Sequence, residues 1–178
     1  MNPEPVRRVL DTLGVRYALI GAHAMAARGY PRFTLDVDLL TTDVRVLDAG
    51  HWSALVRDGA QVDVRRGDSD DPLGGVVHLL LPDGTDVDLV VGKWQWETDL
   101  IARAEPISIG GAPIGVPCTG DLILLKLAAG GTLDLRDAAA LLTLGDRDRV
   151  VRDVEAHIGD VRPDVRDAWR DLLASIDR

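Results

Sequence analysis

The sequence predicts an α+β fold, in which helices pack against a mixed β-sheet and a helical region completes the chain. Short segments that alternate apolar and polar residues, as strands do, occur in the first two thirds of the chain. Turn signals rich in glycine and proline separate these segments. Beyond residue 117 the apolar residues recur at helical spacing instead. We therefore expect an α/β core over residues 1–116 and a C-terminal helical region over 117–178 that packs on it.

In the core, helices and strands are expected to alternate. A first helix over 5–13 ends at Gly14, and an apolar run predicts a strand over 16–20. An alanine-rich stretch favours a helix over 22–28. The remaining core elements are expected as a strand over 36–41, a helix over 44–56, a strand over 61–64, a hairpin of 76–81 with 86–91, a helix over 93–104, and a small hairpin over 106–116 around Gly110 and Gly111.

After Pro117 the chain is expected to be helical, with breaks at Gly130-Gly131, Gly145 and Gly159. The last helices carry an apolar stripe that is typical of amphipathic helices packed on a core. The stripe comprises Val150, Val154, Ile158, Val161, Val165, Trp169 and Leu172.

Composition limits the class of protein. With 178 residues, 46% of them hydrophobic, the chain can bury a core. No apolar run approaches the roughly 20 residues that a membrane helix needs, so no membrane partner is expected. No continuous apolar stretch follows the early charges at Arg7 and Arg8, so the N-terminal segment is not expected to be a signal peptide. A single cysteine, Cys118, fits a reducing, cytoplasmic location.

The charge balance disfavours a grip on long duplex DNA. The formal net charge is −9, which gives no general attraction to nucleic acid, although a local basic patch stays open. Aromatic residues make up 4% of the chain, so a base-stacking platform is not indicated.

An acidic pair is the most informative feature of the sequence. Asp36 and Asp38 alternate with Leu35, Val37 and Leu39 in an expected strand, so both carboxylates leave the same face. Two like charges side by side repel each other, and a hard divalent cation such as Mg²⁺ between them removes the repulsion. In a chain with 29 acidic residues the pair also has a chance explanation.

Before this pair, a buried strand meets the start of a helix at Gly21 and Ala22. Glycine lets a ligand approach the backbone closely because it has no side chain. The free N–H groups and the positive dipole end of a helix N-terminus suit phosphate. The turn is therefore a candidate phosphate site.

A third carboxylate is expected from the second strand of the hairpin over 76–91. Asp86 and Asp88 alternate with apolar residues after a turn at 82–85. We choose Asp88 and interpret Asp86, which is closer to the turn, as a solvated turn residue. The alternative, that Asp86 joins or replaces Asp88, stays open. Three carboxylates can hold two divalent ions about 3.5–4 Å apart, the arrangement used for nucleotidyl transfer.

Taken together, these motifs resemble the nucleotidyltransferase superfamily of the DNA polymerase β type. The matching strings are Ile20-Gly21-Ala22, Asp36-Val37-Asp38-Leu39 and Val87-Asp88-Leu89. The string Arg32-Phe33-Thr34 and the helical stretch 121–137 look most like the small bacterial branch, which includes the abortive-infection toxins of toxin–antitoxin pairs. The resemblance covers roughly residues 5–142.

The resemblance implies a mechanism and two bound Mg²⁺ ions, with Mn²⁺ as an alternative. Asp36 and Asp38 hold the ion that grips a nucleoside triphosphate, and with Asp88 they hold a second ion that lowers the pKa of an acceptor hydroxyl. The turn of Gly21 and Ala22 cradles the terminal phosphates. Attack on the α-phosphorus then releases pyrophosphate.

Further nucleotide-binding candidates follow from the same resemblance: Arg32, Thr34 and Lys126. Each has a plain alternative, namely a surface or ion-paired arginine, an ordinary strand threonine, and a lysine snorkelling from an apolar helix. At position 22 the family usually has Gly or Ser. Ala22 lacks the hydroxyl that could bond a phosphate, although its backbone N–H remains.

Three functional hypotheses result. The first is a magnesium-dependent enzyme that moves a nucleotide from ATP or GTP to a hydroxyl of a tRNA, a protein or a small molecule, as a toxin with an antitoxin partner. The second is a weak or inactive relative that binds nucleotide or a protein partner. The third is a plain metal-stabilised domain, and zinc is not indicated because the four histidines lie far apart in the sequence, at 23, 51, 78 and 157.

Overall fold

A five-stranded mixed sheet forms the centre of the molecule, in a computed structural model that describes residues 2–109, 112–143 and 146–176. The strand order is β1-β2-β5-β4-β3. β2 and β5 run parallel, and the other neighbouring pairs run antiparallel. The strands are β1 (Ala18–Leu19), β2 (Asp36–Thr41), β3 (Gln61–Arg66), β4 (Gly75–Leu80) and β5 (Asp86–Val91).

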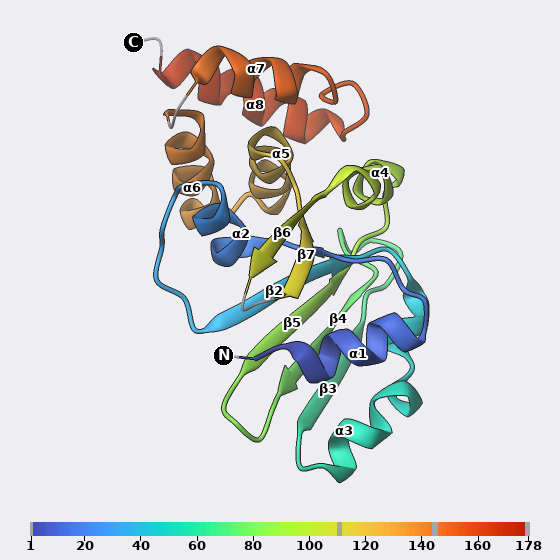
Figure 1. Cartoon of the computed structure of the whole chain (residues 1–178). Helices are drawn as coiled ribbons and strands as arrows, with labels where there is room; N and C mark the ends of the chain where they lie inside the picture. Colours follow the sequence, from blue (N-terminus) through green and yellow to red (C-terminus); the bar gives the residue numbers. More distant parts are fainter. Residues whose placement is uncertain (1, 110–111, 144–145, 177–178) are drawn as a thin grey trace.

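Helices pack on this sheet, and a separate two-stranded hairpin, β6 (Glu105–Ile109) and β7 (Ala112–Val116), lies beside it. Figure 1 shows α7 and α8 stacked at the end of the molecule away from α3, with α5 and α6 between them and the sheet. The helices are α1 (Glu4–Thr12), α2 (Gly21–Ala27), α3 (Ser53–Arg57), α4 (Gln95–Arg103), α5 (Thr119–Ala129), α6 (Thr132–Thr143), α7 (Arg147–Glu155) and α8 (Pro163–Ile176). The predicted fold class, a mixed sheet with helices followed by a helical region, is confirmed.

The two faces of the central strands differ in polarity. In β5 the residues Val87, Leu89 and Val91 are buried, whereas Asp86 and Asp88 stand on the opposite face. A shift of one residue in the pairing would bury the carboxylates, so the alternation fixes the register. The sheet thus presents its acidic positions together.

The segment predicted as a helix over 44–56 is helical but is not one continuous α-helix. Two 3₁₀ segments, η1 (Val44–Leu47) and η2 (Ala49–Trp52), precede the short α3. The side chain of Asp43 accepts a hydrogen bond from the N–H of Arg45, and that of Asp48 accepts one from the N–H of Gly50. Aspartates compete with the helical backbone in this way, so each one restarts the segment.

Other predicted element boundaries lie closer to the observed ones. β1 is shorter than the predicted strand over 16–20, and β3 extends past residue 64 to Arg66. The predicted break at Gly130 is confirmed, because Gly130 ends α5 in the left-handed conformation with φ +69°. The predicted turn at Gly110-Gly111 and the break at Gly145 lie outside the described residues.

The hydrophobic core continues from the sheet into the C-terminal helices. Buried side chains of α2, such as Met25, belong to the same cluster as Leu122 of α5 and Trp169 of α8. The carboxylate of Asp121, at the start of α5, also receives hydrogen bonds from Arg103 of α4, at 2.5 and 3.0 Å. The division of the chain at residue 116 stays a prediction. No helix among the described residues has both the length and the apolar character to cross a bilayer.

Candidate active site

The register of the central strands brings the predicted carboxylates together. Asp38 of β2 lies directly beside Asp88 of β5, and Asp36 lies beside Asp86. Neighbouring strands are about 4.8 Å apart, and paired residues point to the same face. The three carboxylates chosen from the sequence, Asp36, Asp38 and Asp88, therefore share one surface, and Asp86 joins them.

The surroundings of Asp38 disfavour the charged form of its carboxylate. Burial, followed by the charge of Asp88 and that of Asp36, raises the pKa of Asp38 from 3.8 to about 6. Lys126 and Arg32 oppose this shift, which places both cations near the Asp38 carboxylate. An arrangement that raises a carboxylate pKa through like charges is one that a bound cation relieves.

Gly21 packs directly against Asp38. It begins α2 with φ +63°, a left-handed conformation that glycine adopts without strain. A Cβ atom on residue 21 would lie 1.9 Å from Oδ2 of Asp38. The glycine therefore gives the backbone a close approach to the acidic pair.

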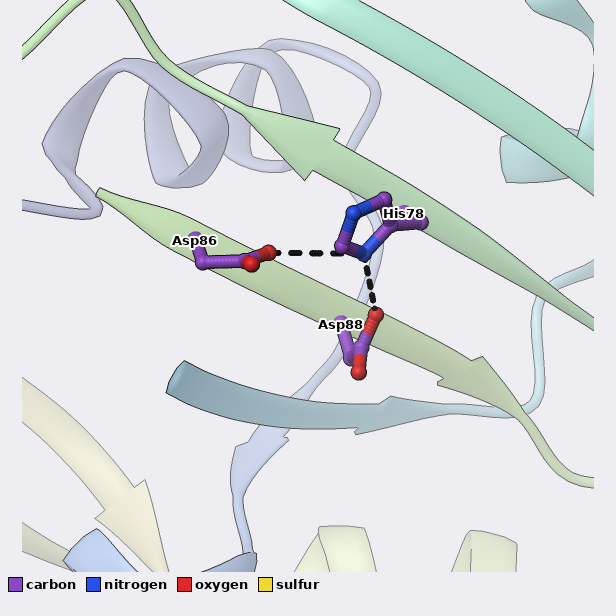
Figure 2. A group of neighbouring side chains, drawn as sticks. All are labelled: His78, Asp86 and Asp88. Carbon is purple, nitrogen blue, oxygen red and sulfur yellow. Dashed lines mark hydrogen bonds and ion pairs between the residues drawn. The ribbon is translucent and has the colours of Figure 1, made fainter. Parts of the chain in front are cut away.

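His78 of β4 contacts two of the carboxylates from the neighbouring strand (Figure 2). Its Nδ1 lies 2.8 Å from Oδ1 of Asp88 and 3.3 Å from Oδ1 of Asp86. The hydrogen bond with Asp88 raises the pKa of His78, and the charges of Asp86 and Asp88 add to the effect against the cost of burial. These three residues offer ligand atoms within 4.8 Å of one another, so a divalent cation has a second possible donor set here, with Asp88 common to both.

Sequence reasoning missed His78, although the predicted hairpin contained the signal. In an antiparallel hairpin the positions of paired residues add up to a constant, and pairing 80 with 86 puts 78 opposite 88. Extending the register of the predicted hairpin from its turn would have placed His78 opposite the candidate metal ligand Asp88.

A cleft of about 490 Å³ opens along β2 and contains most of the predicted site. Its wall at the acidic end includes Gly21, Arg32, Thr34, Asp36, Asp38 and Lys126. Asp88 stands next to this end on β5, whose Val90 also lines the cleft. Ala22 is different, because its side chain is fully buried in the core.

Lys126 extends into the cleft from α5, and its ammonium group forms ion pairs with two carboxylates. Its Nζ lies 2.8 Å from Oδ1 of Asp134 and 3.1 Å from Oδ2 of Asp137, both on α6. Asp137 is 3% exposed at its side chain, and Nε of Arg32 lies 3.8 Å from the same oxygen. Sequence reasoning assigned no role at the site to Asp134 or Asp137, whose carboxylates lie against Lys126 and, for Asp137, near Arg32.

Thr34 supports the start of β2. Its hydroxyl oxygen accepts a hydrogen bond from the N–H of Asp36 at 3.3 Å, which fixes the backbone where the acidic pair begins. Both the proposed ligand role and the plain strand role are compatible with this position at the edge of the cleft.

Comparison with known proteins shows the fold of the chain but does not show its family. The antibiotic-resistance factor ANT(2'')-Ia in solution aligns with a TM-score of 0.52 and 20% identity, over 97% of this chain and 91% of that protein. The chain has the nucleotidyltransferase fold. A crystal structure of the same factor with adenylyl-2''-tobramycin also gives 0.52, at 17% identity over 85% and 91% of the two chains.

A Thermotoga maritima protein described as a nucleotidyltransferase gives a TM-score of 0.50 and 18% identity, over 71% of this chain and 83% of the other. No protein-family model matches the sequence. No curated protein matches it either. The nucleotidyltransferase fold thus rests on structural likeness, and the toxin branch stays a prediction.

Proposed function

We propose that this protein is a metal-dependent nucleotidyltransferase that transfers a nucleoside monophosphate from a nucleoside triphosphate to an acceptor hydroxyl. One observation carries the proposal: Asp36, Asp38 and Asp88 share one face of the sheet, next to the Gly21 turn, in a nucleotidyltransferase fold. Three separate sequence segments converge there, which chance clustering of acids does not explain.

The residues fit a hard divalent cation. The donors are carboxylate oxygens, and Asp38 has a raised pKa because it is buried beside Asp88 and Asp36. Asp36 and Asp38 would hold the ion that meets the triphosphate, and Asp88 would share a second ion with them. When bound, Mg²⁺ or Mn²⁺ neutralises phosphate charge and lowers the pKa of the attacking hydroxyl.

The chain itself positions and neutralises the substrate. Lys126 and Arg32 place positive charge at the cleft wall near Asp38, where phosphate oxygens would lie. The absence of a side chain at Gly21 leaves room for the Asp38 carboxylate against the backbone, so the turn and the acidic pair lie together at the cleft wall. Nucleotidyl transfer needs little covalent chemistry from the protein beyond such positioning.

The acceptor, the nucleotide and the biological role are finer parts of the proposal. The neighbour ANT(2'')-Ia is seen with adenylyl-2''-tobramycin, which favours a small-molecule acceptor. A tRNA or protein acceptor, ATP or GTP as donor, an antitoxin partner and a cytoplasmic location rest on the sequence resemblance. The alternative is a catalytically weak relative that binds nucleotide without turnover; Ala22, which has no hydroxyl to offer, favours it.

The test is transfer of label from each α-³²P nucleoside triphosphate, with Mg²⁺, into a cell extract. We expect label to enter one fraction, and its class (RNA, protein or small molecule) names the acceptor. The Asp38→Asn variant should transfer none. Equal labelling by wild type and Asp38→Asn would refute the site. Binding of nucleotide without any labelling would favour the alternative.

A further inference from the structure

We propose that Trp94 and Arg162 form the platform on which the nucleobase of the bound nucleotide stacks. This inference rests on the proposed function and adds the part of the site that selects a nucleotide over other polyphosphates. It also revises the expectation from composition, because a few aromatic residues suffice when they gather in one cleft.

Trp94 is exposed where a large apolar side chain is costly. It is 41% exposed and lines the cleft that contains Asp36 and Asp38. By contrast, Trp52 and Trp169 are fully buried. An exposed indole inside a concave site is a typical anchor for a planar ligand.

One contact on the ring and one on the backbone restrict Trp94. The guanidinium of Arg162 lies 5.8 Å from the centroid of the Trp94 ring, within the range of a cation–π contact. Arg162 donates to the carbonyl oxygen of Ala128 at 3.3 Å and pairs with Asp164 at 2.9 Å. The backbone N–H of Trp94 donates to Glu97 at 2.8 Å. The platform is thus ordered before a ligand binds, which lowers the entropic cost of stacking.

Trp96 adds a second indole to the cleft, with an unpaired polar atom. Its side chain lines the same cleft and is 4% exposed, yet its Nε1 has no hydrogen-bond partner among the described residues. Buried donors are normally paired, because an unpaired one costs about 1–3 kcal/mol. Because this Nε1 is itself buried, an acceptor of a bound base would pair with it only after the indole shifts toward the cleft.

The cleft combines the polarities that a nucleotide needs. Its lining includes carboxylates and the cations Lys126 and Arg32, which suit metal-bound phosphates, together with indoles and aliphatic side chains such as Leu125 and Leu73. β5 ends at Val91, three residues beyond Asp88, and Trp94 follows three residues later. The carboxylates, the cations and the exposed indole thus line one cleft, which makes a nucleotide a better occupant than a bare polyphosphate.

The experiment compares two ligands on three proteins and a control variant by calorimetry with Mg²⁺. The ligands are an ATP analogue with a methylene bridge between the α- and β-phosphates, and inorganic tripolyphosphate. The proteins are wild type, Trp94→Ala and Trp94→Phe. Base–aromatic stacking is worth enough that we expect Trp94→Ala to weaken the analogue about tenfold. Its affinity for tripolyphosphate should not change, and Trp94→Phe should retain most of the analogue affinity.

The outcomes separate the two proposals. Analogue affinity that is unchanged in Trp94→Ala overturns the platform while leaving the proposed function standing. Equal weakening of both ligands in Trp94→Ala also overturns it, because the tryptophan would then act on the phosphate end or on the fold. If wild type binds neither ligand, both proposals fail. The remote exposed variant Val56→Ala serves as a control and should match wild type with both ligands.

Discussion

At the scale of single residues, Asp38 illustrates a conflict between stability and function. Its carboxylate is kept in a place that disfavours its charge, beside Asp88 and Asp36 and partly out of water. A protein without a cation there would be more stable with a neutral side chain. Such strain is common at functional sites, where residues serve a ligand rather than the fold.

Asp38→Asn should therefore raise the stability of the metal-free protein. The folded pKa of about 6 exceeds the ordinary 3.8, so the folded state takes up a proton as pH falls. The stabilisation that this proton gives is complete below pH 3.8 and is lost as pH rises through 6. At pH 8 we expect a gain of about 2 kcal/mol in the free energy of unfolding for the variant, and this gain should shrink as pH falls through 6.

Urea unfolding of wild type and Asp38→Asn across pH 4 to 8, with EDTA, measures this difference. Asp63→Asn is the matched control, since Asp63 lies on the same sheet face, two strands from Asp88, and pairs with exposed Arg65. A constant difference between wild type and Asp38→Asn over the whole pH range would contradict the electrostatic reading.

Gly21→Ala should disrupt the site, because the new Cβ would lie 1.9 Å from Oδ2 of Asp38. Gly14→Ala is an unusually good control: Gly14 has the same φ of +63°, and a Cβ added there would have no atom within 4 Å. Both variants carry the backbone strain of about 1 kcal/mol, but only Gly21→Ala should also lose stabilisation by Mg²⁺ and nucleotide in thermal melts. If Mg²⁺ and nucleotide stabilise the two variants equally, the close approach of Gly21 to Asp38 does not matter for ligand binding.

At the scale of elements, local pattern predicted the strands that carry the acids because period-two alternation is strong there. Contacts between residues of different elements were harder to predict from the sequence. The choice of Asp88 followed from the hairpin, whereas His78 needed the register of that hairpin to be extended to a residue without an obvious role. Asp43 and Asp48 broke the predicted helix over 44–56 because their side chains cap the backbone, an effect that apolar periodicity does not reveal.

The α5–α6 pair allows a prediction for Lys126. Lys126→Ala should destabilise the protein by about 3 kcal/mol, because Asp137 is left buried without its nearest cation. It should also raise the KM for the nucleotide if Lys126 contacts phosphate. A second change, Asp137→Asn, should recover much of the stability but none of the KM, because it removes the stranded charge without restoring the cation.

Urea titration and steady-state kinetics of wild type, both single variants and the double variant form the required cycle. Full recovery of KM in the double variant would mean that Lys126 acts only through the fold. An unchanged KM in the Lys126→Ala variant would mean that Lys126 does not contact the nucleotide and only snorkels from an apolar helix.

At the scale of the whole molecule, the cleft is assembled from both halves of the chain. Asp36 and Asp38 come from the sheet, whereas Lys126 and Arg162 come from the helical region. Sequence reasoning could reach Lys126 through a family resemblance. It could not predict the contact of Trp94 with Arg162, because the two positions are 68 residues apart, one just before α4 and the other just before α8.

The two halves should therefore unfold together, and Arg103 offers a way to test it. Arg103 of α4 pairs with Asp121 of α5, whose side chain is 1% exposed. Arg103→Ala should cost about 3 kcal/mol because a buried charge loses its partner, whereas Arg65→Ala, which breaks an exposed pair, should cost under about 1 kcal/mol. The loss in Arg103→Ala should appear as one transition moved to lower urea, seen alike by tryptophan fluorescence and by circular dichroism. Two separated transitions would mean that the regions before and after residue 116 are independent units joined by a weak interface, and the cleft would then open and close with that interface.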